Sequence, residues 1–62
     1  MSMTIKQLRL AKEISQEQMA AICDVHRNTY AVWEENPDKI SIKDAKLIAK
    51  ALGEDVSIFF KD

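Results

Sequence analysis

The chain has 62 residues, enough for one small domain that buries only about 60% of the surface of its unfolded chain. One cysteine and one histidine exclude an internal disulfide and a metal cage built from those residue types. Nine Lys and Arg against ten Asp and Glu give a net charge of -1, which argues against a surface coated in positive charge for nucleic acid and leaves local basic patches open. We expect a single domain over residues 1–62 with no cofactor and no metal.

The composition also limits the class of protein. No run approaches the roughly 18 apolar residues of a membrane span, and the opening MSMTIKQ lacks the basic and apolar regions of a signal peptide. A hydrophobic content of 47% with one glycine and one proline excludes a disordered or low-complexity segment. A cytoplasmic protein with no membrane partner is therefore expected.

Three stretches share one helix start signal, a Ser or Thr followed three residues later by a side chain that can bond back to the cap. They are Thr4 with Gln7, Ser15 with Gln18, and Ser41 with Asp44. Apolar residues at helical spacing follow each of them. The first helix is predicted to reach about Glu13 and the second to span about 16–23. The third of these stretches carries Ile42, Ala45, Ile48, Ala49 and Leu52 until Gly53, the residue type expected just beyond a helix end.

A further helix is predicted over about 27–35. Tyr30 and Trp33 lie three apart on one side of it, and Asn36-Pro37 ends it. No stretch shows the alternation of a half-buried strand over more than four residues, so the fold is predicted to be all-α.

The last element is a short helix capped by Asp55, the fifth helix of the chain. Its inward face is predicted to hold Val56, Phe59 and Phe60. Three apolar residues find no place in the predicted core: Ile22, Leu47 and Ile58.

Asp24 to His26 separate the second helix from the third, which is the spacing of a helix-turn-helix. Ala20 lies where the two helices would cross, and a small residue there permits close approach. The segment SQEQMAAICDVHRNTYAVWEEN resembles the helix-turn-helix of the Cro/C1-type (XRE) family of phage repressors and related regulators. LRLAKEISQEQMA and SIKDAKLIAKALGEDVSIFF are similar to the family's opening helices and its closing pair. The resemblance covers nearly the whole chain and implies a compact five-helix, lambda-repressor-like DNA-binding domain.

The resemblance also implies roles for individual residues. Gln16, which opens the second helix, would contact a phosphate and brace the third helix. Arg27, Asn28 and Val32 would meet base edges in the major groove. Arg9 would form an ion pair with Glu34, near the end of the third helix.

The chemistry of the third helix supports this reading. At 100° per residue, Arg27, Asn28 and Val32 lie on the side opposite Tyr30 and Trp33. Arg can bond guanine O6 and N7 together, Asn can bond adenine N6 and N7, and Val can touch a thymine methyl group. The alternative is that these are ordinary solvated positions.

Three residues depart from the family pattern. Asp24 and Asn36 replace glycines of the family, and both residue types tolerate a left-handed backbone better than most. Glu35 projects from the outward face of the third helix, where its charge should repel phosphate and weaken binding.

Other polar residues have competing interpretations. His26 is expected to cap the third helix or to contact a phosphate. The resemblance implies that Lys39, Ser41 and Lys43 contact the DNA backbone, whereas Lys46 and Lys50 are most simply a solvated face. Cys23 is predicted to be a buried core thiol rather than a redox sensor.

The sequence therefore predicts a DNA-binding transcriptional regulator. The expected activity is that of a repressor whose homodimer binds a two-fold double-stranded DNA operator, with Ile58 at the dimer interface. No nucleophile with a base, paired carboxylates or phosphate loop indicates an enzyme, and no small-molecule site is evident. The rival hypothesis is a protein-interaction module on the same fold, such as an antirepressor, which the acidic balance and Glu35 favour.

Overall fold

A computed structural model describes residues 3–60 of the chain, and of Phe60 it describes the backbone alone. The described residues form four α-helices and two 3-10 helices and contain no strand: α1 (Ile5–Ala11), α2 (Gln16–Ile22), α3 (Arg27–Glu35), η1 (Pro37–Lys39), α4 (Ile42–Ala51) and η2 (Val56–Phe60). The all-α prediction is confirmed, but the fifth predicted helix is a 3-10 helix. The expected inward face of that element includes the Phe60 side chain, which lies outside the described residues.

Capping side chains fix where the helices begin. In both predicted boxes that contain Gln, Thr4 with Gln7 and Ser15 with Gln18, the hydroxyl accepts from the third backbone N–H and the Gln amide oxygen accepts from the cap N–H. The start of α4 is looser. The Ser41 hydroxyl accepts from the Asp44 backbone N–H at 3.2 Å, but the Asp44 carboxylate reaches the Ser41 hydroxyl rather than the backbone.

Three helices end with the same backbone closure. After α1, α2 and α4 comes one residue with a left-handed backbone: Glu13 (φ 57°), Asp24 (φ 56°) and Gly53 (φ 69°). In each case the next N–H donates back to a carbonyl five residues earlier, as Ile14 does to Arg9 at 3.1 Å. The left-handed Asp24 was expected. The first helix was predicted to reach about Glu13, whereas α1 ends at Ala11 and Glu13 takes the left-handed backbone that follows it.

The end of α3 differs from the other three. Asn36 was expected to take a left-handed backbone in place of a glycine, and this is wrong because its φ is -136°. The cause is Pro37, since a proline ring forces the residue before it toward extended conformations. The Asn36 backbone N–H still bonds the Val32 carbonyl at 2.9 Å, so the chain leaves the helix by a bend into η1.

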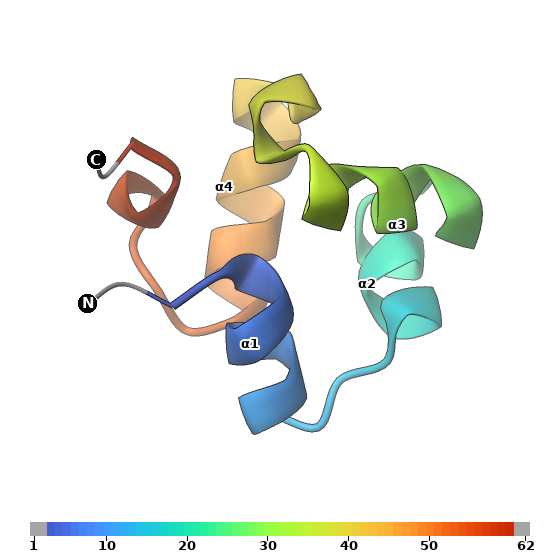
Figure 1. Cartoon of the computed structure of the whole chain (residues 1–62), viewed down its shortest axis with the longest axis horizontal. Helices are drawn as coiled ribbons and strands as arrows, with labels where there is room; N and C mark the ends of the chain where they lie inside the picture. The colour runs from blue at the N-terminus through green and yellow to red at the C-terminus, as the bar shows by residue number, and fades with distance from the viewer. Residues whose placement is uncertain (1–2, 61–62) are drawn as a thin grey trace.

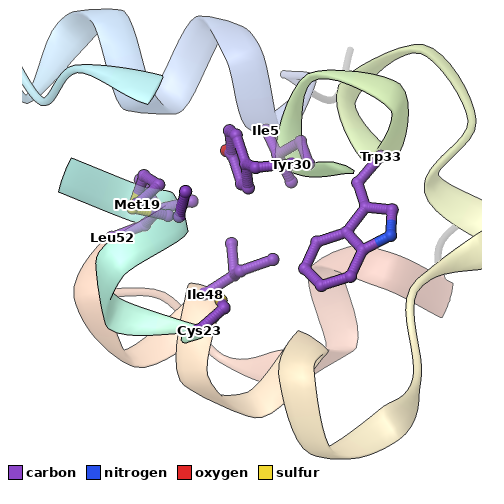
Figure 2. Packing of buried hydrophobic residues seen from close by; sticks show 8 residues of the cluster. Ile5, Met19, Cys23, Tyr30, Trp33, Ile48 and Leu52 are labelled. Carbon is purple, nitrogen blue, oxygen red and sulfur yellow. The ribbon is translucent and has the colours of Figure 1, made fainter. Parts of the chain in front are cut away.

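The core joins all four α-helices. Figure 2 shows Ile48 of α4 in the space bounded by Tyr30 and Trp33 of α3, with Met19 and Leu52 together at one side. The Tyr30 and Trp33 rings meet edge to face, with 6.3 Å between centroids and 69° between planes, a favourable aromatic arrangement. Tyr30, Met19, Ile48 and Leu52 are fully buried.

Some apolar residues lie elsewhere than expected. Leu47 and Ile58 were left without a place in the core, yet both are half-buried and pack against it. Ile42, expected on the inward stripe of α4, is 63% exposed. It occupies the first turn of that helix and lines a surface hollow with Pro37 and Phe59.

The arrangement leaves one surface of α3 uncovered. Figure 1 shows α2 and α3 on one side of the molecule, α4 running through the middle, and η2 on the opposite side, beside α4. The first residues of α3 lie at the outer edge of the molecule, far from the described chain ends. No helix within residues 3–60 is long and apolar enough to cross a membrane.

Candidate functional site

The outer face of α3 presents the side chains that sequence reasoning assigned to it. Arg27 and Asn28 in its first turn are exposed, and Val32 one turn later is 47% exposed. Tyr30 and Trp33 occupy the opposite, buried face. Glu35 is exposed at the end of the helix. The helix therefore offers a cationic group, an amide and an apolar group to solvent, followed by one carboxylate.

His26 is the N-cap of α3. Its Nδ1 accepts from the Asn28 backbone N–H at 3.1 Å, so this nitrogen carries no proton and Nε2 carries the proton of the neutral ring. Of the two roles expected of His26, capping is the one that the free chain displays. The cap also stabilises the first turn of α3, which contains Arg27 and Asn28.

Gln16 ties the start of α2 to both ends of α3. Its Nε2 donates to Glu34 Oε1 at 2.9 Å, and its Oε1 accepts from Arg27 Nη1 at 3.0 Å. The bond to Glu34 fixes which end of the amide is the acceptor, and that acceptor faces Arg27. Sequence reasoning assigned Gln16 to bracing α3, but it did not foresee the bond to Arg27.

Arg9 and Glu34 form a buried ion pair between α1 and α3. Arg9 Nε lies 2.6 Å from Glu34 Oε2, and the two side chains are 7% and 3% exposed. Arg9 Nη1 also donates to the Ile14 carbonyl at 2.7 Å. The hydrogen bond to Glu34 raises the pKa of Arg9. Burial alone would raise the pKa of Glu34, but the hydrogen bonds from Arg9 and Gln16 outweigh burial and lower it.

Two further ionisable groups are buried, the Tyr30 hydroxyl and the Cys23 thiol. The Tyr30 hydroxyl makes no hydrogen bond to any described residue, and burial followed by the nearby Glu34 carboxylate raises its pKa. Cys23 is a buried free thiol, and burial raises its pKa too. A thiol whose ionised form is disfavoured reacts slowly, which agrees with the core interpretation of Cys23.

The three residues expected to contact the DNA backbone lie in and after η1. Lys39 ends η1, and Lys43 lies in the first turn of α4; both are exposed. Ser41 is exposed as well, but its hydroxyl already caps α4 and donates to Asp44 Oδ2 at 3.0 Å. Neither lysine forms a salt bridge with a residue that the structure describes, so both can bind a phosphate, while Ser41 would have to exchange its bond to Asp44.

A hollow of about 450 Å³ separates α1 from the outer face of α3. Its lining residues include four members of the site already described and one cation that sequence reasoning did not single out, Lys6; they are Thr4, Lys6, Gln16, Ala31, Val32, Glu34 and Glu35. The sequence gives no signal for Lys6, because a lysine on a short amphipathic helix is most simply a solvated residue.

The described part of the chain offers no metal site, since no group of three or more His, Cys, Asp or Glu side chains in it could hold an ion. The site consists instead of exposed polar groups on a braced helix. What it can do is form hydrogen bonds and ionic contacts with a partner surface.

Comparison with known proteins identifies the arrangement. A family model described as helix-turn-helix matches residues 5–59. Two uncharacterised HTH-type transcriptional regulators, from Rickettsia conorii and Rickettsia prowazekii, are each 37% identical to the chain over 57 residues. The matches cover 92% of this chain but 46% and 44% of those proteins, so the chain spans less than half of their length. No solved structure matches the chain significantly. The chain belongs to the Cro/C1-type (XRE) helix-turn-helix family.

Proposed function

We propose that this chain is the sequence-specific DNA-binding domain of a transcriptional regulator, and that it acts as a repressor by occupying a two-fold operator. In this proposal α3 lies in the major groove. Its first residues meet base edges, while residues on the neighbouring elements hold the phosphates on either side.

The observation that carries the proposal is the outer face of α3. Arg27, Asn28 and Val32 are exposed together there, on a helix whose other face is fixed in the core. A guanidinium, a carboxamide and a branched apolar group are suited to guanine, adenine and the thymine methyl group, respectively. The names of the two Rickettsia relatives, both uncharacterised HTH-type transcriptional regulators, agree with a role in transcription regulation.

The hydrogen-bond network favours DNA as the ligand. Gln16 uses one Nε2 hydrogen for Glu34, which leaves the second for a phosphate oxygen. Arg27 uses one N–H for Gln16 and keeps four for a base. The brace therefore restrains Arg27 without using up its donors. Restraint before binding lowers the entropy lost when a side chain is fixed against a base.

Pairing of two copies forms part of the proposal, because a domain this small gains affinity and site length by binding as a dimer. Ile58 packs against its own core, but it also lines a surface hollow with Met3, Pro37 and Phe59. This hollow is lined by five apolar residues and by Thr4, Glu34 and Glu35, and its apolar part beside η2 is a surface that a second copy could cover. We assign the dimer contact to Ile58 on this basis.

The second candidate is a protein-interaction module, which is favoured by the exposed Glu35 and the net charge of -1. A carboxylate near the DNA repels phosphates, whereas it would suit a basic protein partner. The two candidates differ in what variants of α3 should do.

The test compares two classes of variant on a duplex selected from a random pool. Arg27→Ala and Asn28→Ala should each cost about 1–3 kcal/mol on the selected duplex, and Asn28→Ala should lose preference mainly at one base pair per half-site. Lys43→Ala should weaken binding to all sequences alike and reduce the slope of log K against log salt by about one. If the Arg27 and Asn28 variants keep full affinity for selected DNA, α3 does not read bases and the protein-interaction candidate stands.

A further inference from the structure

The hollow between α1 and α3 brings together residues with different proposed tasks. Gln16 is a proposed phosphate contact and Val32 a proposed base contact, and both line this one hollow. Lys6 of α1 lines it too and is the one cation among its lining residues. Since about 450 Å³ is many times the roughly 30 Å³ that a water molecule takes up in the liquid, the Lys6 side chain has room to change conformation there.

Some of the charged side chains that line the hollow have partners within the described residues and others have none. Glu34 is bonded to Arg9 and Gln16, so its charge is already compensated. Glu35 and Lys6 are both exposed, and neither forms a salt bridge within the described residues. The hollow therefore holds one uncompensated carboxylate and one uncompensated ammonium group. An approaching polyanion would meet attraction on the α1 side and repulsion on the α3 side.

We propose that Lys6 is a further phosphate contact of the DNA-bound chain, an inference that rests on the function proposed above. A docking that puts Val32 at a base edge and Gln16 at a phosphate brings the sugar-phosphate backbone along the mouth of the hollow that both residues line. Lys6 is the cation available at that mouth. The flexible four-carbon side chain of Lys6 lets its ammonium group reach a phosphate of the DNA backbone, which it binds as a point charge.

The contact also accounts for how the domain tolerates Glu35. Glu35 is the last residue of α3 and lines the same hollow as Lys6, which lies in the first turn of α1. A phosphate bound by the Lys6 ammonium group gains an attraction that offsets its repulsion by Glu35. Lys6 is thus a positioning residue: it contributes no base recognition, and it sets which part of the hollow the backbone occupies.

The experiment measures the binding constant of the full chain for its selected duplex between 50 and 300 mM KCl, with Lys6→Ala compared with Lys46→Ala. Lys46 is exposed on α4 and lines no part of the hollow, so it is a matched loss of one charge. Lys6→Ala should lower the slope of log K against log salt by about 0.9, the value for one phosphate contact on duplex DNA. Lys46→Ala should leave the slope unchanged. Circular dichroism melts establish that both variants are folded.

Repeating the measurement with Glu35→Gln separates two explanations. If Lys6 binds a phosphate, Lys6→Ala should lower the slope in this background as well. If Lys6 acts only by neutralising Glu35, its effect should disappear, and the proposal is overturned. It is overturned equally if Lys6→Ala behaves as Lys46→Ala does while the parent chain binds normally. Failure of the parent chain to prefer any duplex would instead overturn the proposed function.

Discussion

Replacing Glu34 with glutamine tests the network that connects α1, α2 and α3. Both carboxylate oxygens accept hydrogen bonds, Oε2 from Arg9 Nε and Oε1 from Gln16 Nε2. A glutamine has one acceptor oxygen, so its NH2 group must face one of these donors. If the NH2 group of the new glutamine faces Gln16, the Gln16 amide can rotate so that its oxygen accepts from it. The Gln16 NH2 group would then face the Arg27 guanidinium, which is also a donor. No arrangement of Glu34→Gln keeps all the bonds.

The magnitude follows from the burial of the pair. Side chains that are 7% and 3% exposed cannot be rescued by solvent, so Glu34→Gln leaves the Arg9 charge buried with only neutral acceptors, such as the Ile14 carbonyl. Removing one partner of a buried pair costs about 3–5 kcal/mol. At roughly 0.05–0.15 kcal/mol per residue, a chain of 62 residues has about 3–9 kcal/mol in total. The variant should therefore lose at least about a third of its stability, and its Tm should fall by at least about 12 °C.

The assay is urea unfolding at pH 7 followed by circular dichroism, with Glu35→Gln as the control. Glu35 is the neighbouring exposed carboxylate, and its replacement should change the free energy of unfolding by no more than about 0.5 kcal/mol. The double variant Arg9→Met with Glu34→Leu, which removes both charges, should be more stable than either single variant. A loss below about 1 kcal/mol in Glu34→Gln would refute the reasoning, because it would mean that the pair is not desolvated in solution.

Four further predictions concern stability and assembly. His26→Ala should cost about 1 kcal/mol in urea unfolding because it removes the cap of α3, whereas His26→Asn should retain most of it; equal losses would contradict the capping role. Glu13→Gly should raise the free energy of unfolding by about 0.5–1 kcal/mol, because the residue has a φ of 57°, and a lower value would contradict the left-handed closure. The pKa of Glu34 lies below its ordinary 4.5, so the contribution of its charge to the free energy of unfolding is complete above pH 4.5 and is lost as the pH falls through the lowered pKa. Unfolding measured from pH 7 to pH 3 should therefore show the parent chain losing stability in this acid range, with Glu34→Gln varying less. Ile58→Lys should weaken binding to a two-fold site but not to a half-site, and gel filtration on DNA should show loss of the second copy; unchanged affinity and size would place the interface elsewhere.

The local signals of the sequence predicted most of the fold. Ser and Thr caps with a Gln three residues later gave the starts of α1 and α2 to the residue, because both partners of a capping box are local. Tyr30 and Trp33 were correctly assigned to the core from their spacing alone. The limits of α3 also agree with the prediction, since a histidine that can cap and a proline that cannot continue a helix bound it.

The misassigned residues depend on contacts that local patterns do not encode. Glutamate is a residue type typical of helix interiors, yet α1 ends before Glu13, because the Ile14 N–H bonds back to the Arg9 carbonyl and Glu13 takes a left-handed backbone. Ile42 fits the apolar period of α4 but lies where no other helix covers it. Leu47 and Ile58 fall outside the apolar stripes and are still half-buried, because they pack against the buried core cluster.

The candidate site divides in the same way. Exposure of Arg27 and Asn28 follows from helical geometry once the core face is known. The bond between Gln16 and Arg27 joins residues eleven apart on two helices, and it depends on how the turn sets their crossing. The hollow that includes Lys6 depends on the placement of α1 against α3, which no local motif specifies.

The most direct test of DNA reading is competition between duplexes at physiological salt. A duplex selected from a random pool is bound to the chain and challenged with unlabelled selected duplex or with random duplex of the same length. Specific binding predicts that the selected duplex competes about a thousandfold better, the lower end of what sequence-specific proteins achieve. Equal competition by the two duplexes would contradict the account, because a face that only attracts phosphates cannot tell one sequence from another.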